Sequence, residues 1–263
     1  MPTDLWLIDA FTDAAFAGNP AGVCFLTKPR PEEWMQSVAR EMNQAETAFL
    51  VPRKDGYDLR WFTPTVEVDL CGHATLASAH FLWAKRKVKP TATARFHTRS
   101  GVLTAKKKGK WIVLDFPATP PEPCEAPPYL LDAFRASGSP AFKSPFDYMV
   151  VLEKPAKLRE LKPDFRLLNA IEARGVIVTS PSDEAGVDFF SRFFAPTVGV
   201  PEDPVTGSAH CALAPYWAER LGRPSLVGRQ LSARGGIVQV EVAGDRVRLG
   251  GKAVTVIKGT IEA

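Results

Sequence analysis

The 263-residue sequence is poor in cysteine, and its four cysteines stand far apart, at positions 24, 71, 124 and 211. No C-x-x-C pair occurs, which argues against a disulfide framework and against a structural zinc knuckle. The glycine patterns of nucleotide sites, G-x-x-x-x-G-K-[ST] and G-x-G-x-x-G after a strand, are also missing. The sequence therefore lacks the usual signatures of phosphate-binding loops and dinucleotide folds.

Long apolar runs and a strong net charge are absent too. No stretch approaches the ~18 apolar residues of a transmembrane helix, and the opening MPTDLWLIDAF has neither a basic region nor a small-residue cleavage site. The 33 Lys and Arg residues only slightly outnumber the 29 Asp and Glu residues. The densest basic run, KKKGK at 106–110, has no interleaved aromatic residues and is typical of a hairpin tip. We expect a cytoplasmic protein with no membrane or nucleic-acid partner.

Turn residues are plentiful, with 19 glycines and 23 prolines at regular intervals. Short β-rich runs lie between them, and several alternate apolar and polar residues as half-buried strands do. Strands are predicted at 5–11, 22–26, 47–51, 57–63, 93–98, 102–106, 111–116, 148–152, 175–179, 188–194, 230–232, 236–242, 246–250 and 253–261. Helices are predicted only at 31–42, 74–85 and 208–221. Many strands with few helices predict an α+β fold.

An internal repeat is the most informative feature of the chain. The segment WFTPTVEV at 61–68 matches FFAPTVGV at 193–200, so that Phe62 and Pro64 meet Phe194 and Pro196 at a spacing of 132. Further along, Ser-Ala-His at 78–80 matches Ser-Ala-His at 208–210 at a spacing of 130. The repeat predicts two similar halves, each with a strand, a sharp turn and a helix, joined by the Pro- and Glu-rich segment 118–128.

The two repeated turns pass through small residues into a helix start. Small residues leave backbone N–H groups uncovered, and a helix N-terminus carries positive partial charge, so each turn can receive a carboxylate. Two such turns facing each other would form a cleft between the halves. The alternative is a pair of ordinary capped helix starts.

Four linked motifs resemble those of the phenazine-biosynthesis isomerase family, or PhzF-like proteins. They are IDAF followed by GNP, EMN-x-x-E, FTP-x-x-E-x-x-x-CGHAT and EDPVTGSAH, and the resemblance covers essentially the whole chain. It implies the fold of diaminopimelate epimerase, with two pseudo-symmetric halves, each a mostly antiparallel β-barrel around a central helix. The implied halves are residues 1–118 with the C-terminal strand 253–263, and residues 119–252.

The resemblance also implies the site. Glu46, His73 and Asp203 match the family's catalytic residues. The substrate-binding positions that match are Asn19, Cys71, Gly72, Thr206, Gly207 and Ser208. The implied reaction is a cofactor-independent isomerisation of a small carboxylate, in which Glu46 moves a proton from one carbon to another. The resemblance implies no metal and a homodimer.

Several alternatives remain open at this point. Without the family, Glu46 reads as a surface carboxylate or as part of an Asn43–Glu46 capping box. Cys71 could be a buried packing residue, or the base of an amino-acid epimerase or racemase together with Asp203 or Glu46. A metal site of Cys71, His73 and His80 lacks a fourth ligand, and His80 and His210 read as structural. The chain could also be a catalytically silent ligand- or partner-binding protein on the same scaffold.

Overall fold

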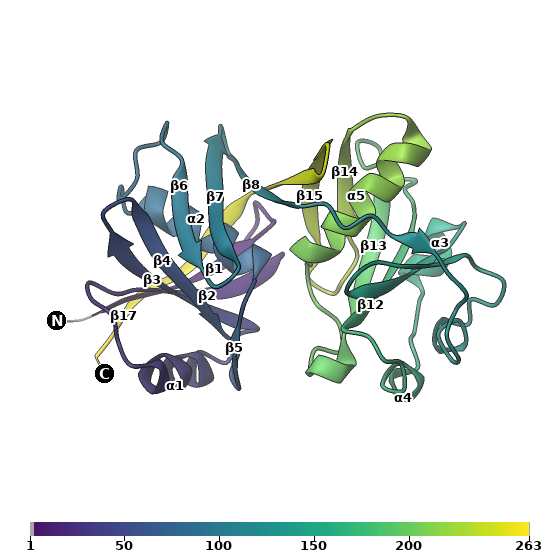
Figure 1. Ribbon diagram of the computed structural model, residues 1–263, viewed down its shortest axis with the longest axis horizontal. Coiled ribbons are helices and arrows are strands. Elements are labelled where there is room, and N and C mark those ends of the chain that lie inside the picture. The colour runs from purple at the N-terminus through teal and green to yellow at the C-terminus, as the bar shows by residue number, and fades with distance from the viewer. Residues whose placement is uncertain (1–2, 263) are drawn as a thin grey trace. The chain divides into compact units, whose positions relative to one another are not determined.

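The structure, a computed structural model, describes residues 3–262 and divides into two compact units (Figure 1). Unit 1 comprises the chain up to Phe116 and the segment from Gly250 onward, and unit 2 is Pro117–Leu249. None of the helices formed by residues 3–262 combines the length and the apolar character that a bilayer span requires.

Unit 1 is a curled, mostly antiparallel sheet. Its strands are β1 (Thr3–Ala10), β2 (Asn19–Phe25), β3 (Glu46–Arg53), β4 (Gly56–Phe62), β5 (Glu67–Val68), β6 (Ala94–Thr98), β7 (Gly101–Lys108), β8 (Trp111–Pro117) and β17 (Ala253–Ile261). They pair in the order β17-β1-β2-β3-β4-β6-β7-β8, with the short β5 also on β4. Two pairs are parallel, β2–β3 and β4–β6, and a helix connects each of them: α1 (Glu32–Met42) and α2 (Gly72–Ala84).

Unit 2 repeats this pattern. Its strands are β9 (Glu122–Pro123), β10 (Ala141–Lys143), β11 (Asp147–Val151), β12 (Gly175–Pro181), β13 (Phe189–Phe194), β14 (Ser225–Gln230) and β15 (Gly236–Ala243), and β16 (Arg246–Gly251) begins here. The parallel pairs are β11–β12, joined by α3 (Pro155–Arg159) and α4 (Phe165–Leu168), and β13–β14, joined by α5 (Gly207–Leu221). Two short 3₁₀ turns, Asp132–Phe134 and Pro196–Val198, complete the unit.

Each sheet has one further strand beside its first strand, and these two added strands occupy equivalent places in the two units. In unit 1 the C-terminal β17 lies antiparallel to β1, from Thr3 opposite Ile261 to Ala10 opposite Ala253. In unit 2, β9 takes the same place beside β10. The matching order of parallel and antiparallel pairs confirms the predicted α+β fold of two pseudo-symmetric halves.

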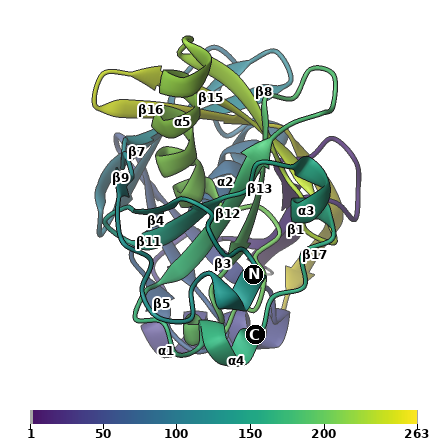
Figure 2. The ribbon, with the colours of Figure 1, turned by 90° about the vertical axis from the view of Figure 1, so that its right-hand side faces the viewer.

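The helix that connects the second parallel pair of strands, α2 in unit 1 and α5 in unit 2, is largely buried in the core of its unit. Ten residues of α2 are buried, from His73 to Trp83, and they cover every face of the helix, as expected of a helix enclosed by strands (Figure 1). Nine residues of α5 are buried, and the helix lies against β14 and β15 (Figure 2). It ends at Gly222, whose φ of 67° is the left-handed conformation predicted for a glycine after a helix.

Three details differ from the sequence-based expectations. The strand expected at 230–232 is wrong, because β14 occupies Ser225–Gln230; Gly228 interrupts its apolar pattern, and the ring of Phe189 fills the space of the missing side chain. Asn43 does not begin a capping box, since it ends α1 in the left-handed conformation with φ 47°. The helices α3 and α4 are too short to give a periodic signal.

The second part of the repeat is not a structural equivalence. Helix α2 begins at Gly72 and α5 at Gly207, a spacing of 135 rather than 130. Ser78 therefore lies in the second turn of its helix, whereas Ser208 is the second residue of α5. The structural counterpart of Cys71 is Thr206, because both residues immediately precede their helix.

Candidate active site

The structure brings three predicted residues of unit 1 together. His73 Nε2 lies 3.2 Å from Glu46 Oε2, and Cys71 Sγ lies 3.5 Å from His73 Nδ1. One ligand atom from each of the three residues falls within a group less than 4.8 Å across. Glu46, Cys71 and His73 therefore form a single cluster, here called the Glu46 cluster.

The fold explains why these residues meet. Glu46 is the first residue of β3, which runs parallel to β2, and Glu46 pairs with Ala21 near the beginning of β2. Asn19 starts β2 and is fully buried, so it lies at the same end of the sheet as Glu46. Cys71 precedes α2, and Gly72 and His73 are the first residues of that helix.

The electrostatics of the Glu46 cluster favour a protonated histidine. Burial by itself lowers the pKa of His73, but Cys71 and Glu46 act in the opposite direction, and the net pKa lies well above its usual value. Burial, reinforced by the Glu46 carboxylate, raises the pKa of the Cys71 thiol despite the opposing effect of His73. Cys71 and Glu46, which both lie against the imidazole ring, therefore act together to favour the protonated form of His73.

Glu46 keeps capacity for a further proton or ligand. Its Oε2 atom is buried and accepts no hydrogen bond of good geometry from residues 3–262, although it lies in ion-pair distance of His73. The Glu46 side chain as a whole is 20% exposed, against 7% for His73. Glu46 therefore has a desolvated oxygen on a side chain that keeps some contact with solvent, which suits a group that exchanges protons with a bound molecule.

The predicted residues of unit 2 form a second cluster around Asp203. Thr206 Oγ1 donates a 2.5 Å hydrogen bond to Asp203 Oδ2. Gln230 at the end of β14 connects the two: its Oε1 accepts from Thr206 N at 2.9 Å, and its Nε2 donates to Asp203 O at 2.7 Å. Gln230 is fully buried, and nothing in its sequence surroundings distinguishes it from an ordinary strand residue.

Both helix starts lack a side-chain cap. The side chains of Cys71 before α2 and of Thr206 before α5 make no capping hydrogen bond to their helices. Thr206 instead gives its hydroxyl to Asp203, and Gly207 and Ser208 open α5. Backbone N–H groups at both helix starts are thus not covered by the residue that usually caps them.

The two remaining helical histidines have structural surroundings, as the sequence suggests. Burial lowers the pKa of His80 to about 4, and its Nε2 lies 2.9 Å from the Thr255 hydroxyl. Burial lowers the pKa of His210 to about 4 as well, and its Nδ1 donates to the carbonyl of Thr206 at 2.8 Å. His80 therefore does not complete a metal site with Cys71 and His73.

The Glu46 cluster offers one nitrogen, one sulfur and one oxygen to a cation. Metal ligands must be deprotonated, however, and the raised pKa of the Cys71 thiol opposes this. A cation would also have to break the His73–Glu46 ion pair.

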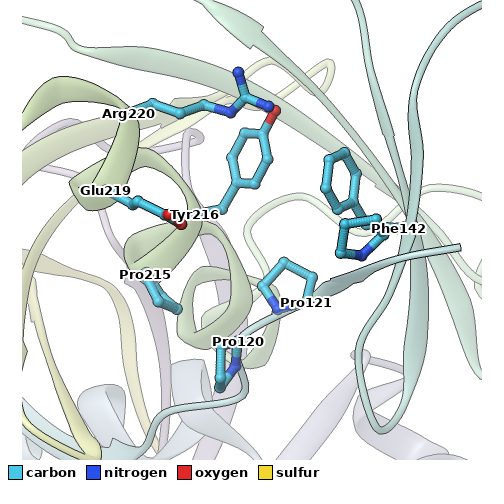
Figure 3. A pocket seen from close by; sticks show the side chains of 8 residues that line it. Pro120, Pro121, Phe142, Pro215, Tyr216, Glu219 and Arg220 are labelled. Atoms are coloured by element: carbon cyan, nitrogen blue, oxygen red, sulfur yellow. The ribbon is translucent and has the colours of Figure 1, made fainter.

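A cavity of about 550 Å³ in unit 2 lies at the other end of α5 (Figure 3). The rings of Phe142 and Tyr216 meet edge to face in this cavity, with their centroids 5.1 Å apart, and the guanidinium of Arg220 lies 4.4 Å above the Tyr216 ring. Its other lining residues are Pro120, Pro121, Pro123, Pro215 and Glu219. None of the predicted site residues lines this cavity.

The model of the family described as phenazine biosynthesis-like protein matches residues 8–259 of the chain. The chain belongs to this family. It is 50% identical over 262 residues to an uncharacterized isomerase of Halalkalibacterium halodurans, with 99% of each chain covered. Other curated relatives in Pseudomonas aeruginosa are also named isomerases. The protein is accordingly an enzyme of the isomerase class, as the four motifs led us to expect.

Solved structures agree with this assignment. The crystal structure of a PhzF-family phenazine biosynthesis protein from Enterococcus faecalis superposes with a TM-score of 0.95 at 41% identity, covering 100% of both chains. A hydroxyproline epimerase from Agrobacterium vitis superposes with a TM-score of 0.64 at 12% identity, covering 99% of this chain and 92% of its own. The second match concerns the fold alone, which is that of the epimerases.

Proposed function

We propose that this isomerase moves a proton on a small carboxylate substrate without a cofactor, using Glu46 as the acid/base. The observation that carries the proposal is the Glu46 cluster, in which a buried carboxylate oxygen lies 3.2 Å from His73. His73, whose pKa is raised, lies against this oxygen, and we assign Glu46 as the base that begins the reaction.

The proton balance requires no other reactant. The Glu46 carboxylate takes a proton from an activated carbon of the substrate, and the electron pair moves into the adjoining conjugated system. Glu46 then delivers a proton to another carbon, so the substrate is isomerised and the enzyme is restored. While the proton is on the Glu46 carboxyl it can exchange with solvent, so turnover in heavy water labels the substrate. His73, kept positive by its raised pKa, stabilises the negative charge that develops between these two transfers.

The other predicted residues receive binding roles in this proposal. The uncapped starts of α2, at Gly72, and of α5, at Gly207 and Ser208, each offer N–H donors that suit a carboxylate. Asn19 is part of the pocket wall, and Thr206 orients the carboxylate of Asp203, the second proton-handling group.

The decisive experiment compares Glu46→Gln with the wild type. The amide keeps the shape of the side chain but cannot carry a proton, so exchange of substrate hydrogen with heavy water should fall by ~10²–10⁴-fold. A panel of small unsaturated carboxylates and amino acids serves as probe, with exchange followed by proton NMR. Retained exchange in Glu46→Gln would refute the proposal, and no exchange of any panel member by the wild type would favour a catalytically silent binding protein.

The rival is an amino-acid epimerase that uses the Cys71 thiol. Its support is the position of Cys71 Sγ, 3.5 Å from His73 Nδ1, but the raised thiol pKa disfavours the thiolate such a base requires. Cys71→Ser should therefore slow exchange by less than about tenfold, since a protonated group that packs is replaced by one of similar size. Exchange lost in Cys71→Ser but kept in Glu46→Gln would reverse the assignment.

A further inference from the structure

Each unit contains an arginine that forms a bidentate ion pair with a glutamate, and that glutamate lies close in sequence to the predicted site residues. In unit 2, Arg192 Nε and Nη2 donate to the two carboxylate oxygens of Glu202 at 2.7 and 2.9 Å. The guanidinium lies 5.0 Å above the ring of Phe194. Its remaining nitrogen, Nη1, donates to the Leu161 carbonyl at 2.7 Å. The arginine side chain is only 12% exposed, so the pair is largely shielded from solvent.

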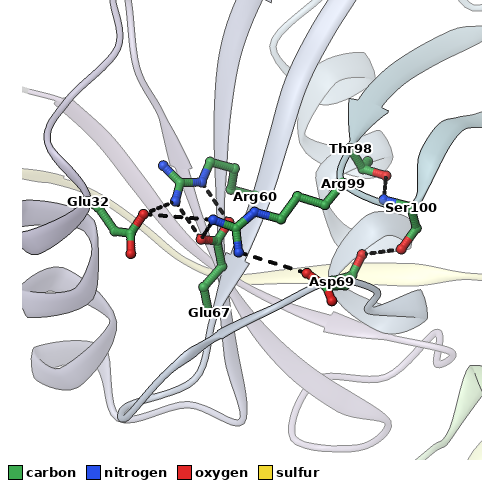
Figure 4. Close-up of polar contacts among 7 residues, drawn as sticks. All are labelled: Glu32, Arg60, Glu67, Asp69, Thr98, Arg99 and Ser100. Carbon is green, nitrogen blue, oxygen red and sulfur yellow. Dashed lines mark hydrogen bonds and ion pairs between the residues drawn. The ribbon is translucent and has the colours of Figure 1, made fainter.

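Unit 1 contains the same arrangement. Arg60 Nε and Nη2 donate to the two oxygens of Glu67 at 2.6 and 2.5 Å, and the guanidinium lies 5.0 Å above the ring of Phe62. The Glu67 side chain is 6% exposed and also receives Arg99 at 2.6 Å (Figure 4). Glu32 completes the group on the other side of Arg60 at 2.5 Å.

The arginines and the rings beneath them occupy equivalent positions of the repeat. Arg60 and Arg192 are 132 residues apart, as are Phe62 and Phe194. The glutamates are not equivalent, because Gly199 stands 132 residues after Glu67. The two equivalent arginines thus pair with glutamates at different positions of the repeat. Both glutamates lie in the segment that connects the strand to the start of the helix.

That segment carries the predicted site residues. Glu202 immediately precedes Asp203, whose N–H donates to the Phe193 carbonyl at 3.0 Å. Phe193 follows Arg192 in β13. The chain at 202–203 is therefore attached to β13 twice, once through the Glu202 side chain and once through the Asp203 N–H. In unit 1, Glu67 lies four residues before Cys71, and the Asp69 carbonyl between them accepts from Ser100 Oγ at 2.7 Å (Figure 4).

We propose that Arg192 and Glu202 are positioning residues that fix Asp203, and that Arg60 and Glu67 fix the turn carrying Cys71 and His73. A bidentate guanidinium–carboxylate contact fixes the direction of the glutamate as well as its distance, which a lysine cannot do. Each of these two arginine–glutamate pairs, here called clamps, therefore fixes the backbone of the adjoining segment before substrate binds. The catalytic consequence rests on the proposed function, whereas the ordering of the segment does not.

The test uses Arg192→Lys, Glu202→Gln and the double variant in the full-length protein. The matched control is Glu241→Gln, which breaks the exposed contact of Arg248 with Glu241 in the same unit, where the N–O distance is 2.8 Å. Amide hydrogen exchange of residues 203–208 in the free enzyme, measured by mass spectrometry, should rise at least about fivefold in the Arg192 and Glu202 variants and stay unchanged in the control. This readout requires no substrate.

The kinetic arm uses the panel member that the wild type turns over fastest. Misplacing a catalytic group by a fraction of an ångström lowers the chemical rate, so kcat should fall ~10–100-fold while KM changes less than about threefold. The double variant should be no slower than the worse single variant, because both changes break one contact. The urea midpoint of each variant separates loss of folded protein from loss of rate.

Three outcomes would overturn the proposal. They are unchanged amide exchange at 203–208, a loss confined to KM, and additive losses in the double variant. If Glu202→Gln does not fold, Arg192→Lys alone decides, since it keeps the charge and loses only the fork. Should Glu46→Gln remain active while the clamp variants lose kcat, the proposed function fails and the positioning role stands.

Discussion

His73 Nε2 and Glu46 Oε2 are 3.2 Å apart, although 26 other residues separate Glu46 and His73 in the chain. Glu46 is the first residue of a strand, and His73 is the second residue of the helix enclosed by the sheet. The carboxylate favours the protonated form of the histidine and helps to raise its pKa, so the contact predicts a specific pH dependence of stability.

The stability of the protein should depend on pH through His73. Its pKa is raised in the folded state, so the ion pair adds stability that is fully present below the unfolded pKa of ~6.5 and is lost as the pH rises through the folded pKa. The stability difference between wild type and Glu46→Gln should accordingly shrink as the pH rises above about 6.5 and through the raised folded-state pKa of His73. Urea unfolding at several pH values measures it, and NMR of the His73 ring should show the pKa falling in the variant.

A matched control is available for this measurement. Asp55 Oδ2 lies 3.2 Å from His97 Nε2, the same separation as in the Glu46 pair, but the Asp55 side chain is 61% exposed. Asp55→Asn should change stability by less than about 1 kcal/mol at any pH, because solvent screens an exposed pair. Equal pH dependence in both variants would contradict the role given to burial.

Gln230 should be important for the stability of the Asp203 cluster. Gln230→Ala removes the acceptor of the Thr206 N–H and the donor to the Asp203 carbonyl. Leaving a buried backbone group unpaired costs about 1–3 kcal/mol, which a shift of the urea midpoint would reveal. Gln36→Ala, which removes one partly buried bond to the Thr63 carbonyl, should cost less. An equal cost for both would argue against the special place of Gln230.

Removing metals should change neither activity nor folding. The Glu46 cluster has the donor atoms for a cation, but its thiol has a raised pKa and its histidine is paired with the carboxylate. Prolonged dialysis against EDTA should therefore leave substrate exchange and the unfolding midpoint unchanged. A stoichiometric metal that restores activity lost on dialysis would disprove the cofactor-independent mechanism.

We also propose that the protein is a homodimer. At micromolar concentration the protein should sediment with a mass of about twice the 28.8 kDa of one chain. Analytical ultracentrifugation over a hundredfold concentration range measures this, and a single 28.8 kDa species throughout would contradict it.

Sequence patterns went far in predicting the fold because its elements are locally consistent. The helix expected at 208–221 is observed at Gly207–Leu221, and the strand expected at 253–261 has those bounds. Failures occurred where distant contacts decide: Gly228 in β14 is required by Phe189, which is 39 residues away. The spacing-130 match failed because identical tripeptides lie in different turns of their helices.

For the site, the sequence identified candidate residues but not the contacts between them. The motifs pointed to Glu46, Cys71 and His73, and the structure brings these three into contact. No local pattern could reveal Gln230 or the Arg192–Glu202 pair, because each contact joins a strand residue to the loop between β13 and α5. Such supporting contacts become visible only once the register of the strands is known.

The pairing of β17 with β1 has a consequence for biosynthesis. Strand β1 leaves the ribosome long before Ala253–Ile261, so its outer edge stays uncovered until β17 has been made. Unit 2, by contrast, already has β9 in place beside β10 when synthesis reaches residue 249. Domains fold as units while the chain grows, so the later half of the sequence is the first that can finish folding, and the exposed edge of β1 is the part of the nascent chain most open to wrong pairing.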